Sequence, residues 1–470
     1  MGTSKDPASS RDGKLLDKEG SEYKALYKGQ NPLDFNFFEA SSIRQVGNKY
    51  VMVFSGYSGK EYGLGNTNSA LRYAFGDSPL GPWRSGGVLV DSRGVVLNED
   101  GSKLITTNAG HNTHGSLQEI NGQWYVFYHR PPRGFGNARQ AMVAPVKITW
   151  DKKPVAKGGV VKITGYDPFA KDNVWTAKAT DGNEYTGAEV TSEGFQIFGL
   201  PPYAYYSAGL ACFMYGPNAN QYMQDNHDVW NNSMDLAGIQ NGGIIGFKYF
   251  GFGGLAQDTK GCKAFEGTKK GDNTTFGVYL TPSGKGAFKI HVKLDDPWKG
   301  QEIGVIDVPA NAAHQTTTYY AAVSAVEGLT GKHAIYLVAD GPEVKQLEQQ
   351  QGPWGRRGPQ QPQRPQGLFD LHGISFTKGA DHLAPLVPQV TITADGKKLN
   401  IPAQPVMSTN ANGYTECNHY QLYAPLKAGS KVQATCDAPK GVKFEISPVI
   451  AGRATVKATY KGKEKIFLIN

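Results

Sequence analysis

Three side chains stand out because their types can take part in acid–base or polar chemistry. Glu39 follows two phenylalanines in the sequence FFEASSIR. An apolar setting raises the pKa of a carboxyl group, and a carboxylic acid with a raised pKa can donate a proton at neutral pH. His114 lies in the sequence GHNTHGS, and Arg139 lies in GNARQ. Taken singly, each has an ordinary explanation: a glutamate at a solvated strand end, a hydrogen-bonded core histidine and a surface arginine.

The segments that contain Glu39 and His114 are each positioned by one of two matching hairpins. Residues 42–54 and 116–128 each contain a short strand, a tight turn and an aromatic-rich strand. The second turn is Asn-Gly, the strongest short signal for a hairpin, because both central residues of a type I′ turn need a positive φ. Another apolar segment follows each hairpin, at 70–74 and 141–146. Such a recurring set of strands predicts blades of a β-propeller, which usually needs about four or more blades to close.

The motifs in these hairpins resemble those of glycoside hydrolase family 43, whose five-bladed propellers cleave polymers containing arabinose, xylose or galactose. The sequence at 37–44 resembles the segment that carries the general acid of the family. The sequences GHNTHGS at 110–116 and WYVFYHR at 124–130 together resemble its last-blade signature. The sequence SPLGPW at 78–83 is typical of the outer turn of a blade. The resemblance extends over about residues 31–150.

The resemblance implies an inverting mechanism with two carboxyl groups. One protonates the leaving oxygen and the other activates water on the opposite face, at a separation of about 6.5–9.5 Å. Glu39 matches the general acid of the family. The resemblance further implies that His114 lies at the propeller axis near a bound metal ion or water and that Arg139 faces the substrate. It implies no cofactor for catalysis.

The general base of the family and a third carboxylate that tunes the acid are expected upstream of Glu39. Only 38 residues precede Glu39, and their aspartates lie in no convincing strand–turn motif. Asp34 is too close along the chain to face Glu39 across a channel. We therefore expect a truncated propeller of about two blades that lacks its general base. Loss of a general base usually lowers the rate by about 10²–10⁴-fold.

The composition favours an all-β protein with many turns, because glycine (59 residues), proline (27) and aromatic residues (11%) are abundant. We expect a partial five-bladed β-propeller, then a β-sandwich, then a small Ig-like β-domain. The expected boundaries are an irregular segment at 1–30, the propeller at 31–165, the sandwich at 166–383 and the Ig-like domain at 384–470. Residues 341–367 are rich in Gln, Pro, Gly and Arg, which predicts a disordered insertion within the sandwich.

The sandwich is expected to bind carbohydrate. Strand-like sequences at 243–250 and 326–338, among others, resemble those of carbohydrate-binding module family 6, which often holds a structural calcium ion. Sugar rings stack on flat aromatic faces, so Tyr249, Trp298 and Tyr319 are candidate platforms. Each is as well explained as a core aromatic, above all Tyr249. Trp298 follows Asp-Asp-Pro in an expected loop and is the best candidate.

Composition also excludes several classes of function. The net charge is +8, but no basic segment with interleaved aromatics predicts a nucleic-acid groove. No apolar stretch of about 18 residues predicts a membrane span, and no signal peptide is evident. A secreted or periplasmic location is implied by the family alone. Disulfides between Cys212 and Cys262 and between Cys417 and Cys436 are as compatible with the sequence as four free thiols.

The expected function is hydrolysis of arabinose-, xylose- or galactose-containing plant polysaccharides. A non-catalytic carbohydrate-binding protein is the alternative, and a structural or adhesion protein built of β-modules is a third hypothesis. The sequence does not decide which sugar is cleaved, because the loops around the sugar pocket set specificity and the same fold hosts several activities. The expected partner is a polysaccharide or oligosaccharide, and we expect a monomer.

Overall fold

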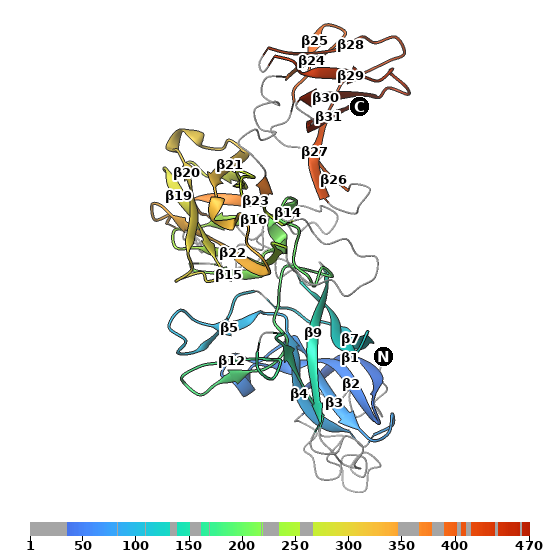
Figure 1. Cartoon of the computed structure of the whole chain (residues 1–470), viewed down its shortest axis with the longest axis vertical. Helices are drawn as coiled ribbons and strands as arrows, with labels where there is room; N and C mark the ends of the chain where they lie inside the picture. The colour runs from blue at the N-terminus through green and yellow to red at the C-terminus, as the bar shows by residue number, and fades with distance from the viewer. Residues whose placement is uncertain are drawn as a thin grey trace, which may run out of the picture.

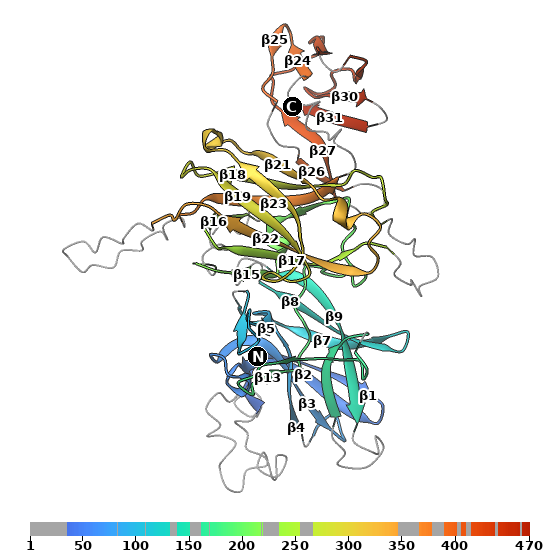
Figure 2. The same cartoon turned by 60° about the vertical axis from the view of Figure 1, so that its left-hand side comes forward.

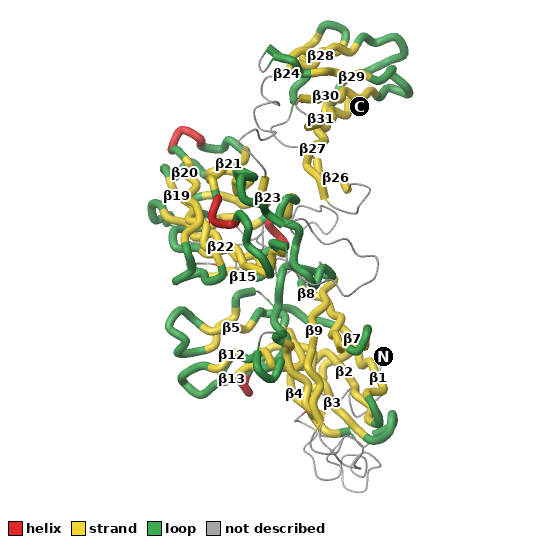
Figure 3. Tube along the Cα trace, in the orientation of Figure 1, coloured by secondary structure: helices red, strands yellow, loops and turns green. Residues whose placement is uncertain are grey.

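Almost all of the regular secondary structure of the described chain is β-strand, arranged in three units along the longest axis (Figures 1 and 2). The computed structural model describes residues 35–81, 83–108, 110–131, 139–150, 161–168, 170–217, 219, 235–253, 267–345, 366–377, 390–401, 406–409, 415–437, 440–460 and 463–470. The helices described there are short 3-10 turns: η3 (Lys60–Tyr62), η5 (Ala208–Leu210), η7 (Ala310–Ala312) and η8 (Ser324–Val326). The prediction of an all-β protein is confirmed at this level (Figure 3). Among the described residues, no helix is long and apolar enough to span a membrane.

The first unit contains two antiparallel sheets. One has the order β1 (Phe37–Val46), β2 (Lys49–Ser58), β3 (Thr67–Gly76) and β4 (Arg84–Asp91). The other has the order β11 (Val174–Trp175), β10 (Val161–Tyr166), β9 (Gln140–Trp150), β8 (Gln123–Arg130) and β7 (Gly115–Ile120). The two predicted hairpins are therefore β1–β2 and β7–β8, one in each sheet. The number of blades in a propeller stays a prediction.

Local sequence explains these hairpins. Asn121 and Gly122 have φ values of 52° and 80°, as the type I′ turn predicted for Asn-Gly requires. Alternation of buried and exposed positions turns the apolar side chains of both sheets toward each other, where they form one core. The serines that begin the two matching segments meet across this interface, with Ser42 Oγ donating to Ser116 Oγ at 3.0 Å.

The first unit continues past the expected boundary at residue 165. Strand β10 ends at Tyr166 and pairs with β11, and Ala188 and Val190 lie in the core between the two sheets. Two small hairpins flank this unit: β5 (Val95–Leu97) with β6 (Leu104–Thr106), and β12 (Ala177–Lys178) with β13 (Glu184–Tyr185). The core of the first unit therefore continues about 25 residues past the expected boundary, through strands too short to give a periodic signal.

The second unit is a β-sandwich with one continuous core between its sheets. The first sheet contains β14 (Tyr205–Ser207), β23 (Phe369–Thr377), β18 (Thr275–Pro282) and β21 (Thr317–Ala322), with β16 (Leu236–Ile239) also paired to β23. The second contains β15 (Phe213–Tyr215), β17 (Ile244–Gly251), β22 (Lys332–Asp340), β19 (Phe288–Leu294) and β20 (Glu302–Val308). Most of the expected disordered insertion, residues 346–365, lies outside the described residues.

The third unit has two small sheets over a separate core. One contains β25 (Lys397–Lys398), β24 (Val390–Ala394) and β28 (Val432–Cys436). The other contains β26 (Val406–Thr409), β27 (Thr415–Leu422), β31 (Lys463–Ile469), β30 (Ala454–Tyr460) and β29 (Lys443–Ile446), with β27 and β31 parallel. An Ig-like topology for this unit stays a prediction, and the expected irregular segment at 1–30 lies outside the described residues.

The cysteines are only partly described. Cys212 is a buried free thiol in the core of the first unit, and its proposed partner Cys262 lies outside the described residues. The side chain of Cys417 also lies outside them. The second disulfide therefore stays a prediction.

Candidate active site

Glu39 lies at an irregularity in β1 that turns its side chain out of the regular ladder. The register between β1 and β2 shifts on both sides of Glu39, and the next residue, Ala40, has a φ of 57°. A bulge of this kind bends the strand and re-aims a side chain. The side chain of Glu39 remains 42% exposed. Its carboxyl group is therefore accessible to a bound molecule.

Two side chains from the segment before β7 hold the carboxylate of Glu39. Asn112 Nδ2 donates to Glu39 Oε1 at 2.8 Å, and His114 Nε2 donates to the same oxygen at 2.9 Å. These partners are 73 and 75 residues away in the chain. Packing of the two sheets therefore brings together the two motifs that the sequence analysis had identified separately.

His129, at the end of β8, connects His114 with Arg139. The backbone N–H of His114 donates to His129 Nε2 at 3.1 Å, and Arg139 Nη1 donates to the same nitrogen at 2.7 Å. Arg139 Nη1 also lies 3.5 Å from His114 Nδ1. Because Nε2 of His129 accepts hydrogen bonds, this ring is neutral. Burial, with the nearby charges of Arg139 and His114, lowers the pKa of His129 to about 4.

The pKa of Glu39 is lowered from its ordinary value. The hydrogen bond from His114 is the largest cause; burial opposes it, and the bond from Asn112 and the charges of His114 and Arg139 lower the pKa further. The expectation that the adjacent phenylalanines raise this pKa was wrong. Their rings pack on β2 instead, Phe37 against Phe54 with centroids 5.2 Å apart and Phe38 against Tyr57 with centroids 5.6 Å apart.

The surroundings of His114 do not fit a metal ion. Nε2 is bonded to Glu39, and Nδ1 faces the guanidinium of Arg139, whose positive charge would repel a cation. Within the described part of the chain, no group of three or more His, Cys, Asp or Glu side chains is arranged to hold a metal. The metal at His114 and the structural calcium stay predictions, and no chemical step below depends on either.

The three aromatic residues proposed as sugar platforms are all partly or fully covered. Tyr249 is half-buried, and its hydroxyl donates to Glu189 at 2.8 Å. Trp298 is half-buried and packs edge-on against Tyr215 with ring centroids 5.7 Å apart. Tyr319 packs against the core of the sandwich. The neighbouring Tyr320 is the residue that lies on the outer face, with 36% of its surface exposed.

A row of small and aromatic residues crosses the outer face of the first sandwich sheet. Gly277 is paired with both Tyr320 and Ser375, and Ser375 is paired with Tyr205, so the four residues share one face. A Cβ at Gly277 would lie 2.7 Å from the Tyr320 ring, and one at Gly373 would lie 2.1 Å from the Tyr205 hydroxyl. Each tyrosine ring therefore lies over a glycine.

Sequence analysis missed Asn112 and His129, although both lie inside the motifs that it quoted. The available signal for Asn112 was its position two residues before His114, whereas His129 lies 15 residues from His114 and had no such local signal. Sequence analysis named Tyr319 rather than the neighbouring Tyr320 and did not consider Tyr205, so it missed both outer-face tyrosines. A one-residue error in strand register exchanges the buried and exposed faces completely.

Comparison with known proteins relates the chain to glycosidases. A xylosidase/arabinosidase of Thermoclostridium stercorarium is 25% identical over 320 residues, which cover 65% of this chain and 54% of that protein. The chain is a relative of glycosidases. A xylosidase/arabinosidase of Bacteroides ovatus is 28% identical over 153 residues, or 33% of this chain and 37% of that protein. The chain thus spans only about half the length of the first relative and less of the second.

Solved structures with similar chains are more distant. A glycoside hydrolase family 43 arabinoxylan arabinofuranohydrolase from Bacillus subtilis matches with a TM-score of 0.32 and 17% identity, over 73% of this chain and 55% of that chain. A family 6 carbohydrate-binding module from Clostridium stercorarium, in complex with cellobiose, matches with a TM-score of 0.24 and 17% identity, over 38% of this chain and 95% of that chain. No protein-family model matches the chain.

Proposed function

We propose that the chain takes part in the hydrolysis of plant polysaccharides that contain arabinose, xylose or galactose, with Glu39 as the general acid of an inverting reaction. The observation that carries this proposal is the carboxylate of Glu39, exposed on one side and held on the other by Asn112 and His114. Similarity to proteins named xylosidase/arabinosidase supports the same class of reaction. A secreted or periplasmic location and a monomeric state accompany this proposal as predictions.

The geometry assigns different tasks to the two carboxylate oxygens of Glu39. Within the described residues, the hydrogen bonds from Asn112 and His114 both end at Oε1. Oε2 is then the oxygen that would carry the proton to the leaving group. Arg139 contacts His114 and His129 through Nη1 and would donate to a substrate hydroxyl from its remaining N–H groups.

The charges around Glu39 set a condition on catalysis. His114 and Arg139 are the charged side chains that act on its pKa, and both favour the ionised form. A general acid must be protonated before it can act. Substrate binding must therefore raise the pKa of Glu39, by excluding water from its carboxyl group.

The test compares Glu39→Gln with the unaltered chain on two kinds of substrate. Nitrophenyl arabinosides and xylosides have a good leaving group, which needs little protonation, whereas xylo- and arabino-oligosaccharides have a poor one. If Glu39 is the general acid, the variant should lose about 10²–10⁴-fold in kcat on oligosaccharides and much less on nitrophenyl substrates. Equal losses on both kinds of substrate, or none on either, would contradict the assignment.

The outer face of the sandwich favours a second candidate function, binding of a carbohydrate without turnover. The rings of Tyr205 and Tyr320 lie over glycines, and an aromatic face can stack with a sugar ring. Tyr320→Ala should weaken retention of the chain on soluble xylan or arabinan in native gels. Tyr423→Ala is the matched control, because Tyr423 is 78% exposed but lies in the third unit. Equal retention of both variants would exclude this face as the binding surface.

A further inference from the structure

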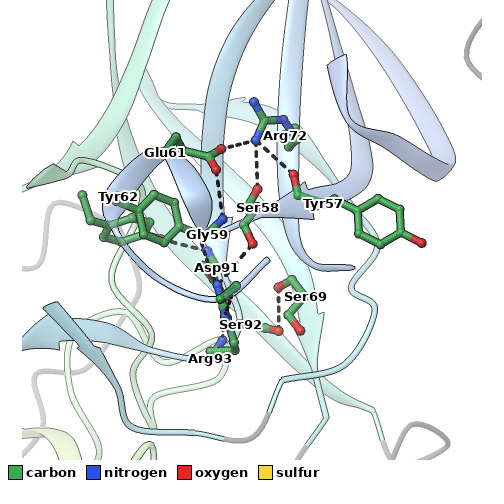
Figure 4. A network of polar contacts seen from close by, with 12 residues as sticks. Tyr57, Ser58, Gly59, Glu61, Tyr62, Ser69, Arg72, Asp91, Ser92 and Arg93 are labelled. Carbon is green, nitrogen blue, oxygen red and sulfur yellow. Dashed lines mark hydrogen bonds and ion pairs between the residues drawn. The ribbon is translucent and has the colours of Figure 1, made fainter. Parts of the chain in front are cut away.

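A buried pair of side chains at the end of β4 links several segments of the first unit. Asp91 has no exposed surface, and the guanidinium of Arg93 donates to both of its oxygens, with the closest contact at 2.6 Å. The hydroxyl of Tyr62 also donates to Asp91. The same guanidinium donates to the carbonyl of Gly65 at 2.7 Å. It also donates to the carbonyl of Ser58 at 3.3 Å (Figure 4). These hydrogen bonds use Nε, Nη1 and Nη2 of Arg93, so its guanidinium is held in one orientation.

The backbone next to this pair holds the segment that carries Asn112 and His114. The carbonyl of Arg93 accepts from the backbone N–H of Thr107 at 3.1 Å and of Asn108 at 2.8 Å. The hydroxyl of Ser92 has a single proton, whose nearer acceptor is the carbonyl of Ser69 at 2.8 Å and whose second acceptor is the carbonyl of His111 at 3.3 Å. Ser92 and Arg93, which directly follow β4, therefore contact the segment that leads into β7 at Thr107, Asn108 and His111.

Close packing adds a second constraint on this loop. A Cβ at Gly110 would lie 2.4 Å from Cγ of Arg93 and 2.3 Å from Oγ of Ser69. The loop backbone therefore rests directly on the Arg93 side chain and has no room to move toward it. A shift of Arg93 must shift the loop, and with it the two donors to Glu39.

We propose that Asp91 and Arg93 are positioning residues that hold Asn112 and His114 at hydrogen-bonding distance from Glu39. This proposal rests on the proposed function for its effect on catalysis, but its geometric content is independent of that function. Neither Asp91 nor Arg93 is in contact with Glu39 in any described interaction. They act through the loop at 107–114, by fixing the backbone from which both donors project.

The experiment measures the ionisation of Glu39 directly. The chain is labelled with ¹³C at the glutamate carboxyl carbons, and the Glu39 signal is identified by its loss in Glu39→Gln. Asp91→Asn should move the pKa of Glu39 up toward its ordinary value, because the bonds from His114 and Asn112 lower it in the intact chain. On a glycoside substrate, kcat should fall by about 10–100-fold while KM changes little, as expected for a misplaced catalytic group.

Milder variants and a matched control distinguish a loss of positioning from a loss of folding. Ser92→Ala removes only the hydroxyl contacts of this network, and Gly110→Ala displaces the loop without changing any charge. Both should raise the pKa of Glu39 in a chain whose circular dichroism is unchanged. Asp77→Asn breaks the ion pair with buried Lys49 at the opposite end of β3 and should leave the Glu39 titration unchanged.

The outcomes separate this proposal from the proposed function. An unchanged Glu39 titration in folded Asp91→Asn, Ser92→Ala and Gly110→Ala chains would overturn the positioning role. A shift of equal size in Asp77→Asn would also overturn it, because the effect would then follow loss of any buried ion pair. If the intact chain hydrolyses no glycoside, the proposed function fails, while the titration still decides whether Asp91 and Arg93 position the donors.

Discussion

Arg130 joins the first unit to the sandwich, and its replacement by methionine is the most informative stability test of this structure. The side chain is fully buried, at the end of β8 directly after His129. Nη1 donates to the carbonyl of Ala211 at 3.0 Å and Nη2 donates to that of Leu210 at 2.8 Å. Both acceptors belong to the segment around η5, at the start of the sandwich.

The magnitude follows from two opposing contributions. Each hydrogen bond from a charged donor contributes about 1.5–3 kcal/mol, so loss of both costs about 3–6 kcal/mol. Burial of the cation itself is unfavourable, lowers the pKa of Arg130 and costs several kcal/mol, which methionine regains. Methionine is flexible enough to fill most of the vacated space. We therefore expect Arg130→Met to lower the free energy of unfolding by about 1–3 kcal/mol.

Thermal unfolding followed by tryptophan fluorescence provides the assay. A loss of this size should lower the unfolding midpoint of the first two units by about 2–4 °C for each kcal/mol. Arg130→Lys should give an intermediate result, because one ammonium group cannot reach both carbonyls in the same way. Arg453→Met is the control, because Arg453 is exposed in the third unit. If Arg130→Met has the same midpoint as this control, the two hydrogen bonds do not join the units energetically.

His129 should make the fold sensitive to acid. Its pKa in the folded chain is about 4, below the ordinary value of 6.5. Between pH 6.5 and pH 4 the unfolded chain therefore takes up a proton at His129 that the folded chain does not. Stability should therefore fall from pH 6.5 to pH 4, and less steeply in His129→Gln, as urea unfolding at several pH values would show. Glu189→Gln leaves the buried ammonium of Lys248 without its carboxylate at 2.6 Å and should cost about 3–5 kcal/mol in the same assay. Gly86→Ala places a Cβ 2.0 Å from a buried tyrosine ring and should cost about 1–3 kcal/mol, whereas Gly65→Ala, with no atom within 4 Å, should cost far less.

Local signals in the sequence predicted elements and turns well. The Asn-Gly pair at 121–122 predicted a type I′ hairpin, and both residues have positive φ. The matching segments at 42–54 and 116–128 predicted equivalent hairpins in separate sheets, which the structure contains. These features depend on residues only a few positions apart, so sequence patterns can specify them.

Distances between remote segments were not predictable in the same way. The boundary expected at residue 165 falls inside the first unit, because packing of β10 and β11 on β9 extends that core. Tyr319 and Tyr320 are both plausible sugar platforms in sequence, and only the pairing of β18 with β21 shows which one faces outward. Such pairings depend on the register between strands that lie far apart along the chain.

The sequence by itself determined that the protein is built of β-strands, that Glu39 and His114 lie shortly before two matching segments, and which side chains are available for chemistry. Only the tertiary structure decided that the pKa of Glu39 is lowered. The reason is physical: a carboxyl pKa depends on the groups within a few ångströms, and the donors to Glu39 come from residues 73 and 75 positions away. The adjacent phenylalanines, which suggested the opposite shift, turn their rings onto a neighbouring strand.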